Sequence, residues 1–170
     1  MKVREEFDRL TVRALAPFDV SVVALGGYMS IVSAPLMNSF LGVNVHPADL
    51  GIKRENGKPK YTGDDAVKKA ILAGEKVLRS STHIVEPEVD CGRVLIVSSP
   101  LELKLGENFD PSNGELVKRV AKENQDRLKE VGDWEIFPKT LLFIAQGRYQ
   151  VDDNGRLYFD GTPIPIGLRS

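Results

Sequence analysis

The chain has 170 residues, of which 42% are hydrophobic, so it is long enough for one globular domain, over residues 1–170, that buries about 70% of its unfolded surface. Its 24 acidic and 23 basic residues are mixed along the sequence, which argues against nucleic acid or an anionic membrane as a partner. The single cysteine, Cys91, excludes an internal disulfide and a cysteine-based metal cluster. We expect a cytoplasmic protein, because the longest apolar run, Val20–Leu25, is too short to span a bilayer and no signal segment is recognisable.

The first half of the chain alternates between helical and extended patterns. Val3–Ala16 has apolar residues at helical spacing and predicts an amphipathic helix. Asp19–Leu25 is rich in valine and nearly all apolar, which predicts a strand buried on both faces in a parallel sheet. Tyr28–Leu41 predicts a short helical region, and Gly42–Val45 predicts a second strand that ends at His46.

The remaining patterns continue this alternation and end in a hairpin. They predict an exposed loop at Ala48–Gly63, a helix at Ala66–Ala73, strands at Ser81–Val85 and Arg93–Ser98, helices at Glu115–Val131 and Phe137–Gln146, and a β-hairpin at Tyr149–Phe159 with its turn at Asn154-Gly155. Trp134 and Phe137 are expected in the core. The whole order predicts an α/β fold with a parallel or mixed sheet, in which ligands bind at the carboxyl ends of the strands.

Both histidines of the chain lie in short polar segments that follow apolar runs. Asn44 and His46 are two residues apart on a predicted strand, so both side chains point to the same side. If the loop with Asp90 meets them, its carboxylate orients the imidazole and the amide can donate to a developing oxyanion. This set suits transfer of an acyl-type group to an amine. A histidine before a proline is also typical of a structural residue, and His83 fits either a supporting role or simple burial.

Several segments, taken together and in register, resemble a known family. They are Leu25-Gly26-Gly27-Tyr28-Met29, Asn44-Val45-His46-Pro47-Ala48-Asp49-Leu50, Lys60-Tyr61-Thr62-Gly63, Ser81–Val85 with Asp90-Cys91-Gly92, Ile136-Phe137-Pro138, Gln146-Gly147-Arg148 and Leu157–Gly161. Their order and spacing are similar to those of the folate-dependent formyltransferases, and most like the glycinamide ribonucleotide transformylases. The resemblance covers nearly the whole chain and implies a formyltransferase-like, Rossmann-type fold with a mostly parallel sheet flanked by helices.

The resemblance also implies an activity and assigns residues to it. The activity is formyl transfer from 10-formyltetrahydrofolate to a small amine of purine biosynthesis, without a metal. The implied catalytic residues are Asn44, His46 and Asp90, supported by Ser81 and His83; Tyr28, Met29, Ser30, Ile31, Val32, Glu86 and Val89 would bind folate, and Asp133 would contact the amine. Two other functions stay open: hydrolysis of formyltetrahydrofolate, and a non-catalytic module that forms homo-oligomers through an exposed sheet edge.

The sequence departs from the family pattern in two ways. The resemblance begins at the helix before the family's fourth strand, so the family's N-terminal half, with the Gly-rich loop that holds a substrate phosphate, has no counterpart among these 170 residues. In addition, Ser30 stands where the transformylases usually have an arginine for the folate tail, and Arg79 stands where they usually have glycine.

Overall fold

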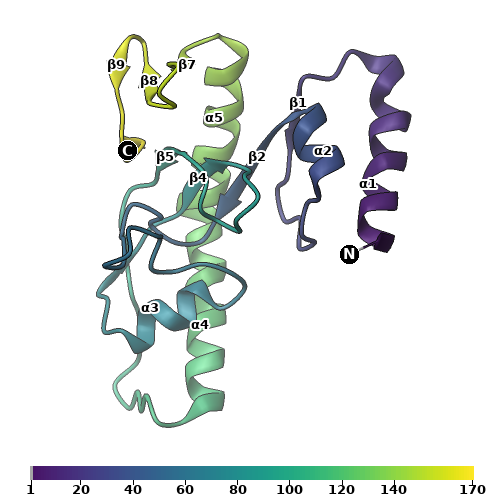
Figure 1. Cartoon of the computed structure of the whole chain (residues 1–170). Coiled ribbons are helices and arrows are strands. Elements are labelled where there is room, and N and C mark those ends of the chain that lie inside the picture. The colour runs from purple at the N-terminus through teal and green to yellow at the C-terminus, as the bar shows by residue number, and fades with distance from the viewer. Residues whose placement is uncertain (1) are drawn as a thin grey trace.

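The computed structural model describes residues 2–170 and contains one five-stranded sheet, two small sheets and five α-helices (Figure 1). The α-helices are α1 (Lys2–Leu15), α2 (Ala34–Ser39), α3 (Ala66–Leu72), α4 (Gly114–Leu128) and α5 (Trp134–Ala145), with a 3-10 turn η1 (Ala16–Phe18) and a π-helical turn η2 (Lys129–Asp133). The strands are β1 (Val22–Ala24), β2 (Leu41–His46), β3 (Val77–Leu78), β4 (Ser81–Ile84), β5 (Val94–Val97), β6 (Leu101–Glu102), β7 (Tyr149–Val151), β8 (Leu157–Phe159), β9 (Thr162–Pro163) and β10 (Leu168–Arg169).

The main sheet has the order β1-β2-β4-β5-β10, and the expected α/β class is confirmed. The pairs β1–β2 and β5–β10 at its two sides are parallel, whereas β2–β4 and β4–β5 in its centre are antiparallel. Antiparallel pairing places residues of β2 and β4 directly opposite one another: Asn44 is paired with His83, and His46 with Ser81. Paired residues point to the same face of a sheet, so these four side chains share one face.

The opposite face of the sheet packs against α5. Val43 and Leu95 are fully buried there, and Phe137, Leu141 and Ile144 of α5 pack against them. A hydrogen bond between the hydroxyls of Thr82 and Thr140, 2.7 Å apart, also joins β4 to α5. Apolar packing on one face leaves the other face of the central strands for polar side chains.

The two helices expected at Glu115–Val131 and Phe137–Gln146 form one column in Figure 1, because the π-helical turn η2 connects α4 to α5. Leu128 of α4 is fully buried in a second apolar cluster that includes residues of α3. The expectation that Trp134 and Phe137 both lie in the core is wrong for Trp134. Its side chain is 67% exposed at the start of α5, while Phe137, three residues on, faces the sheet.

Two further expectations need correction. The Asp19–Leu25 strand is not buried on both faces: only Val22–Ala24 is extended, and β1 is the outermost strand of the sheet, so its residues are half-buried or exposed. The segment Ala48–Gly63 is not an exposed loop throughout. Its two ends are buried at Leu50 and Tyr61, and only residues 53–58, between the bridged residues 53 and 59, are all exposed.

The expected C-terminal hairpin is present as β7 and β8, with β9 as a third strand. At the other end of the chain, α1 lies against α2 beside β1, away from α5 in Figure 1. Within residues 2–170, none of the helices combines the length and the apolar character that a bilayer crossing requires.

Candidate active site

The candidate site is built on the polar face of β2 and β4. Asn44 and His46 alternate with the apolar Val43 and Val45 along β2, and the antiparallel register sets His83 opposite Asn44. Nδ2 of Asn44 lies 3.4 Å from Nε2 of His83. The contact between the side chains of Asn44 and His83 follows from the strand register and does not depend on a loop.

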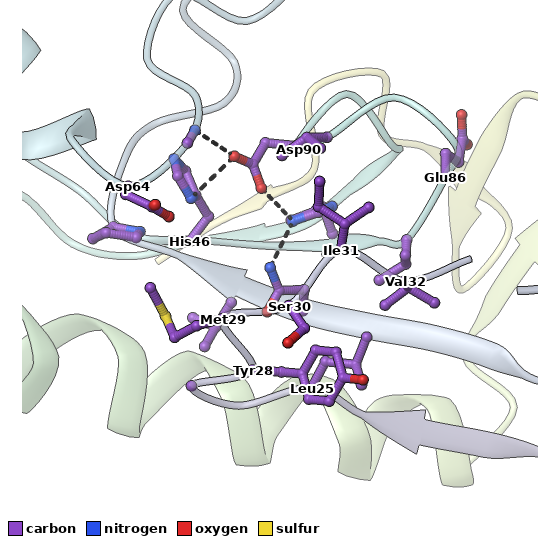
Figure 2. Close-up of a pocket in the computed structure, with 18 of the residues that line it drawn as sticks. Leu25, Tyr28, Met29, Ser30, Ile31, Val32, His46, Asp64, Glu86 and Asp90 are labelled. Atoms are coloured by element: carbon purple, nitrogen blue, oxygen red, sulfur yellow. Dashed lines mark hydrogen bonds and ion pairs between the residues drawn. The ribbon is translucent and has the colours of Figure 1, made fainter. Parts of the chain in front are cut away.

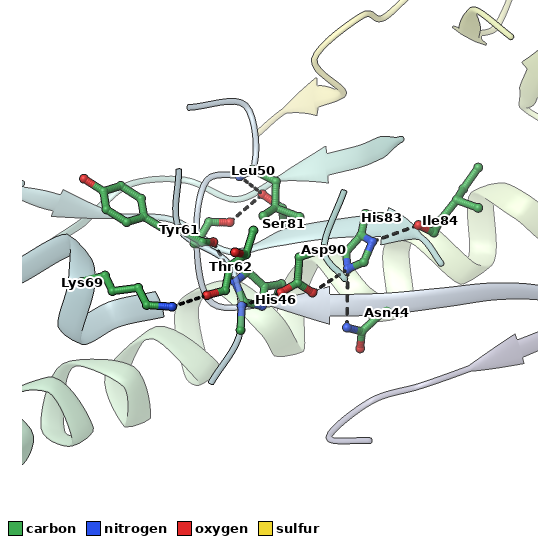
Figure 3. A network of polar contacts seen from close by, with 12 residues as sticks. Asn44, His46, Leu50, Tyr61, Thr62, Lys69, Ser81, His83, Ile84 and Asp90 are labelled. Carbon is green, nitrogen blue, oxygen red and sulfur yellow. Dashed lines mark hydrogen bonds and ion pairs between the residues drawn. The ribbon is translucent and has the colours of Figure 1, made fainter. Parts of the chain in front are cut away.

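Asp90 lies between the two histidines (Figure 3). Its Oδ2 is 3.4 Å from Nδ1 of His46, and its Oδ1 is 3.5 Å from Nε2 of His83. The backbone N–H of Gly63 donates to Oδ2 over 2.7 Å. Asp90 has a left-handed backbone, with φ of 56°, a conformation that is uncommon outside glycine and that concentrates at functional sites. The loop conformation therefore holds a buried carboxylate against two buried imidazoles.

Backbone carbonyls determine which ring nitrogens carry hydrogen. Nε2 of His46 donates to the carbonyl of Tyr61 over 3.0 Å, and Nδ1 of His83 donates to the carbonyl of Ile84 over 2.9 Å. In neutral rings the other nitrogens carry lone pairs, and both face Asp90. The distances of 3.4 and 3.5 Å exceed the roughly 2.7–2.9 Å of a charge-assisted hydrogen bond, as expected for lone pairs beside a carboxylate. The cluster is therefore arranged to accept a proton.

The environment shifts the pKa of both partners downward. Burial lowers the pKa of His46 and outweighs the opposing charge of Asp90. Burial alone would raise the pKa of Asp90, but the neighbouring imidazole of His83, the positive charge that His46 carries when protonated and the hydrogen bond from the Gly63 N–H outweigh it and hold this pKa below its usual value. Near neutral pH, an ionised Asp90 therefore faces an unprotonated His46.

Ser81 supports the segment that follows His46, and its hydroxyl bonds to the backbone rather than to the carboxylate of Asp90. Its hydroxyl donates to the carbonyl of Ala48 over 2.7 Å and accepts from the N–H of Leu50 over 3.0 Å. Ser81 is fully buried, so both bonds are shielded from water. These two bonds tie the segment that follows β2 to the start of β4.

A cavity of about 210 Å³ opens beside this cluster, and Figure 2 shows Tyr28, Ser30, His46 and Asp90 around it. All seven residues expected to bind folate line it, together with Asn44, His46, His83 and Asp90: Tyr28, Met29, Ser30, Ile31, Val32, Glu86 and Val89. Sequence reasoning missed two polar lining residues. Asp64 directly follows the Lys60-Tyr61-Thr62-Gly63 motif and could have been found from it, whereas Gln125 of α4 had no signal at all.

Asp133 is placed apart from this set. It ends η2, does not line the cavity, and accepts a hydrogen bond from the hydroxyl of Ser80, the residue before β4. Burial raises the pKa of Asp133, opposed by that hydrogen bond and by the charge of Lys129. Within residues 2–170, no group of three or more His, Cys, Asp or Glu side chains is arranged to hold a metal ion.

A family model described as formyl transferase matches residues 1–131, which is more than half of the chain. The chain belongs to the formyl transferase family. The chain is 30% identical over 156 residues to the trifunctional purine biosynthetic protein adenosine-3 of Gallus gallus, a match that covers 91% of the chain and 13% of that protein. It is 26% identical over 164 residues to the phosphoribosylglycinamide formyltransferase of Escherichia coli K12, which covers 95% of the chain and 66% of that protein.

A solved structure has the same fold. The phosphoribosylglycinamide formyltransferase of Coxiella burnetii matches the chain with a TM-score of 0.68 at 23% identity, over 98% of the chain and 69% of that protein. The expected family and its fold are thereby confirmed. The chain spans only part of each of these relatives, so their complete activities are not carried over with the family name.

Proposed function

We propose that this protein transfers a formyl group from 10-formyltetrahydrofolate to a small-molecule amine of the phosphoribosylglycinamide type. The observation that carries the proposal is the convergence of Asn44, His46 and Asp90 at one cavity, whose other wall is the Tyr28–Val32 segment. An amide donor, an imidazole and a carboxylate are the groups that attack by an amine on a formyl carbon requires. Two relatives named for phosphoribosylglycinamide formyltransferase activity support the same class.

The proposed reaction begins with attack of the amine nitrogen on the formyl carbon. The carbonyl π electrons move to the formyl oxygen, and one N–H of Asn44 stabilises the oxyanion. The attacking nitrogen loses a proton to the pair formed by His46 and Asp90. The oxyanion electrons then re-form the carbonyl, the bond between the formyl carbon and the folate nitrogen breaks with its electron pair going to that nitrogen, and the same proton is delivered there. No further reactant is consumed, because the proton and both electron pairs are accounted for.

Asn44 has more direct access to the oxyanion than His46 has. One of its amide hydrogens is directed at His83, and the other makes no hydrogen bond within residues 2–170. Both ring nitrogens of His46 are engaged in this conformation, with the Tyr61 carbonyl and with Asp90. A direct contact between a His46 N–H and the oxyanion therefore requires the hydrogen bond to Tyr61 to open. We assign proton transfer to His46 and Asp90, and oxyanion stabilisation primarily to Asn44.

The test measures formyl transfer to glycinamide ribonucleotide with 10-formyltetrahydrofolate as donor. We expect turnover in the wild type and a loss of about 1,000-fold or more in kcat in His46→Ala and Asp90→Asn, as for removal of acid–base and electrostatic groups acting together. Asp126→Asn, an exposed carboxylate on α4, is the matched control and should retain full activity. Full activity in both site variants would refute the assignment.

Omitting the amine separates transfer from hydrolysis. Release of formate at the same rate without an amine would replace the transferase proposal by the hydrolase one. The homo-oligomer stays a prediction that rests on the position of β1 at the edge of the sheet. Light scattering measures it directly, and a stable monomer at all concentrations would contradict it.

A further inference from the structure

Helix α1 buries one charged residue although most of its surface is exposed. Val3, Phe7 and Leu10 all face solvent over more than half of their area, whereas Asp8 is 0% exposed. A buried carboxylate is unfavourable unless it is paired and hydrogen-bonded. The contacts of Asp8 therefore indicate what α1 holds in place.

Asp8 binds Ser33, the residue that directly follows the Tyr28–Val32 segment. Its Oδ2 accepts the backbone N–H of Ser33 over 2.7 Å and the hydroxyl of Ser33 over 2.6 Å. Ser33 is also the N-cap residue of α2, and its hydroxyl makes no cap hydrogen bond but points to α1, where it donates to Asp8. A serine at this position normally stabilises its own helix, so the contact with α1 takes precedence here.

Arg4, one turn earlier on α1, reaches the other end of the same segment. Its Nη2 lies 2.8 Å from Oδ1 of Asp8, and its guanidinium lies over the ring of Tyr28, 5.1 Å from the centroid. A guanidinium over an aromatic face is attracted by the ring. Arg4 and Asp8 thus form one unit that touches the first residue of the segment and the residue just after its end.

Between these two anchors the segment has little support of its own. The backbone groups of Met29–Val32 make no hydrogen bonds to other backbone groups of the described chain, and no helix or strand includes these residues. The side chains of Met29 and Ile31 are 78% and 70% exposed, yet both residues line the cavity. An apolar, unpaired segment keeps one conformation only if its ends are fixed.

We propose that Asp8, with Arg4, is a positioning residue that fixes the Tyr28–Val32 wall of the cavity in the conformation that binds the folate donor. The inference rests on the proposed function and adds a residue that lies twenty positions before the start of that wall in the sequence. Asp8 touches neither the reacting atoms nor the Asn44, His46 and Asp90 cluster. Its loss should therefore weaken binding of the donor and leave the chemical step unchanged.

The experiment compares Asp8→Ala and Asp8→Asn with Glu6→Gln, an exposed carboxylate on the same helix. We expect Asp8→Ala to raise KM for the donor about tenfold with kcat within twofold of wild type, as for loss of hydrogen bonds to a charged group. Asp8→Asn keeps the shape of the side chain and one acceptor oxygen, so it should give a smaller rise. Glu6→Gln should change neither constant.

Hydrogen–deuterium exchange without ligand separates positioning from general destabilisation. In Asp8→Ala, exchange should become faster in peptides covering residues 28–33 and stay unchanged in peptides covering β4. Unchanged KM and unchanged exchange at residues 28–33 would overturn the proposal, and so would a fall in kcat with an unchanged KM. A wild type that neither binds a folate analogue nor transfers formyl would instead refute the proposed function, and the exchange result would still test the contact between α1 and this segment.

Discussion

Asn44 and His83 face each other across the antiparallel pair of β2 and β4, with Nδ2 of Asn44 3.4 Å from Nε2 of His83. Because Nδ1 of His83 donates to the carbonyl of Ile84, Nε2 carries the lone pair that receives the amide hydrogen. The contact fixes which end of the Asn44 amide is the N–H end. His83 therefore decides whether a donor or an acceptor faces the cavity.

Replacing His83 tests this relationship. His83→Ala should lower kcat about 10- to 100-fold, since a misoriented Asn44 loses one hydrogen bond to a charged oxygen, and it should leave KM for the donor unchanged. Steady-state kinetics measure both constants. Thr82→Val is the matched control, because Thr82 is adjacent on β4 but faces α5; its melting temperature should fall while kcat stays at the wild-type value. Wild-type kcat in His83→Ala would show that Asn44 needs no support.

The left-handed backbone of Asp90 predicts a difference between two replacements. Asparagine adopts positive φ more readily than other non-glycine residues, so Asp90→Asn should keep the loop conformation and the acceptor for Gly63. Asp90→Ala loses that acceptor and adds about 1 kcal/mol of backbone strain. Urea unfolding should therefore show Asp90→Ala as the less stable variant, although both lose activity. Equal stability of the two variants would mean that the carboxylate does not hold this loop.

The lowered pKa of His46 predicts how stability depends on pH. A histidine whose folded pKa lies below the unfolded value of about 6.5 takes up protons more readily in the unfolded chain, so its protonation opposes folding. The free energy of unfolding should fall as the pH drops below about 6.5 and continue to fall until the folded pKa is reached. In His46→Gln this part of the slope should be absent. If the free energy of unfolding depended more steeply on pH in His46→Gln than in the wild type, the pKa of His46 would be raised on folding and not lowered.

The same shift predicts the acid limb of activity. Protonation of His46 removes the proton acceptor, so kcat/KM of the free enzyme should fall with an apparent pKa below 6.5. The pKa of Asp90 lies below its usual value, so Asp90 stays ionised throughout this range and its own contribution to stability is lost only as the pH falls below about 3.8. A fall in kcat/KM with an apparent pKa above 7 would contradict the assignment of the acid limb to His46.

The positions of the site residues along each segment were predictable from the sequence, whereas the contacts between strands were not. Alternation along β2 placed Asn44 and His46 on one side, and the loop after β4 brought Asp90 to them. The contact between Asn44 and His83 was not predictable, because it depends on an antiparallel register that no local pattern specifies. Ser81 was expected as a supporting residue, but its two bonds to the backbone after His46 became visible only in three dimensions.

Two incorrect predictions about the fold have a common cause. Val22–Ala24 has the composition of a central strand, but its burial depends on a neighbouring strand on its other side, which the described chain does not provide. The charged Ala48–Gly63 segment suggested solvent exposure, yet Leu50 and Tyr61 are buried because a turn brings its ends back to the body. Composition predicts how a residue behaves on average, whereas burial is decided by what packs beside it.

A substitution at Asp133 tests whether this residue contacts the amine substrate, a role distinct from that of the catalytic cluster. If it contacts the amine substrate, Asp133→Asn should raise KM for the amine and leave KM for the folate donor unchanged, because Asp133 does not line the cavity beside Tyr28–Val32. Ser80→Ala removes the hydroxyl that donates to Asp133 and should give a weaker form of the same effect. Two-substrate kinetics distinguish the constants. A change confined to the donor KM would remove Asp133 from the amine site.

Gly92 lies where a larger side chain should lower both the stability of the protein and its kcat. A Cβ at this position would lie 1.8 Å from the carbonyl oxygen of Ile84, the same oxygen that accepts the Nδ1 hydrogen of His83. Gly92→Ala must therefore push the Asp90 loop away from β4, and overpacking of this kind costs about 1–3 kcal/mol. We expect a lower free energy of unfolding together with a lower kcat.

Gly114→Ala is the control for Gly92→Ala, since its added Cβ would meet no atom within 4 Å beyond its chain neighbours and its own helix backbone, and the residue begins α4. An alanine there should be neutral or stabilise the protein by about 0.4–1 kcal/mol. Denaturant unfolding and steady-state kinetics on both variants compare the two glycines directly. If Gly92→Ala lowered stability but left kcat intact, the Ile84 carbonyl would not set the orientation of His83, and Asn44 would have to be held by another contact.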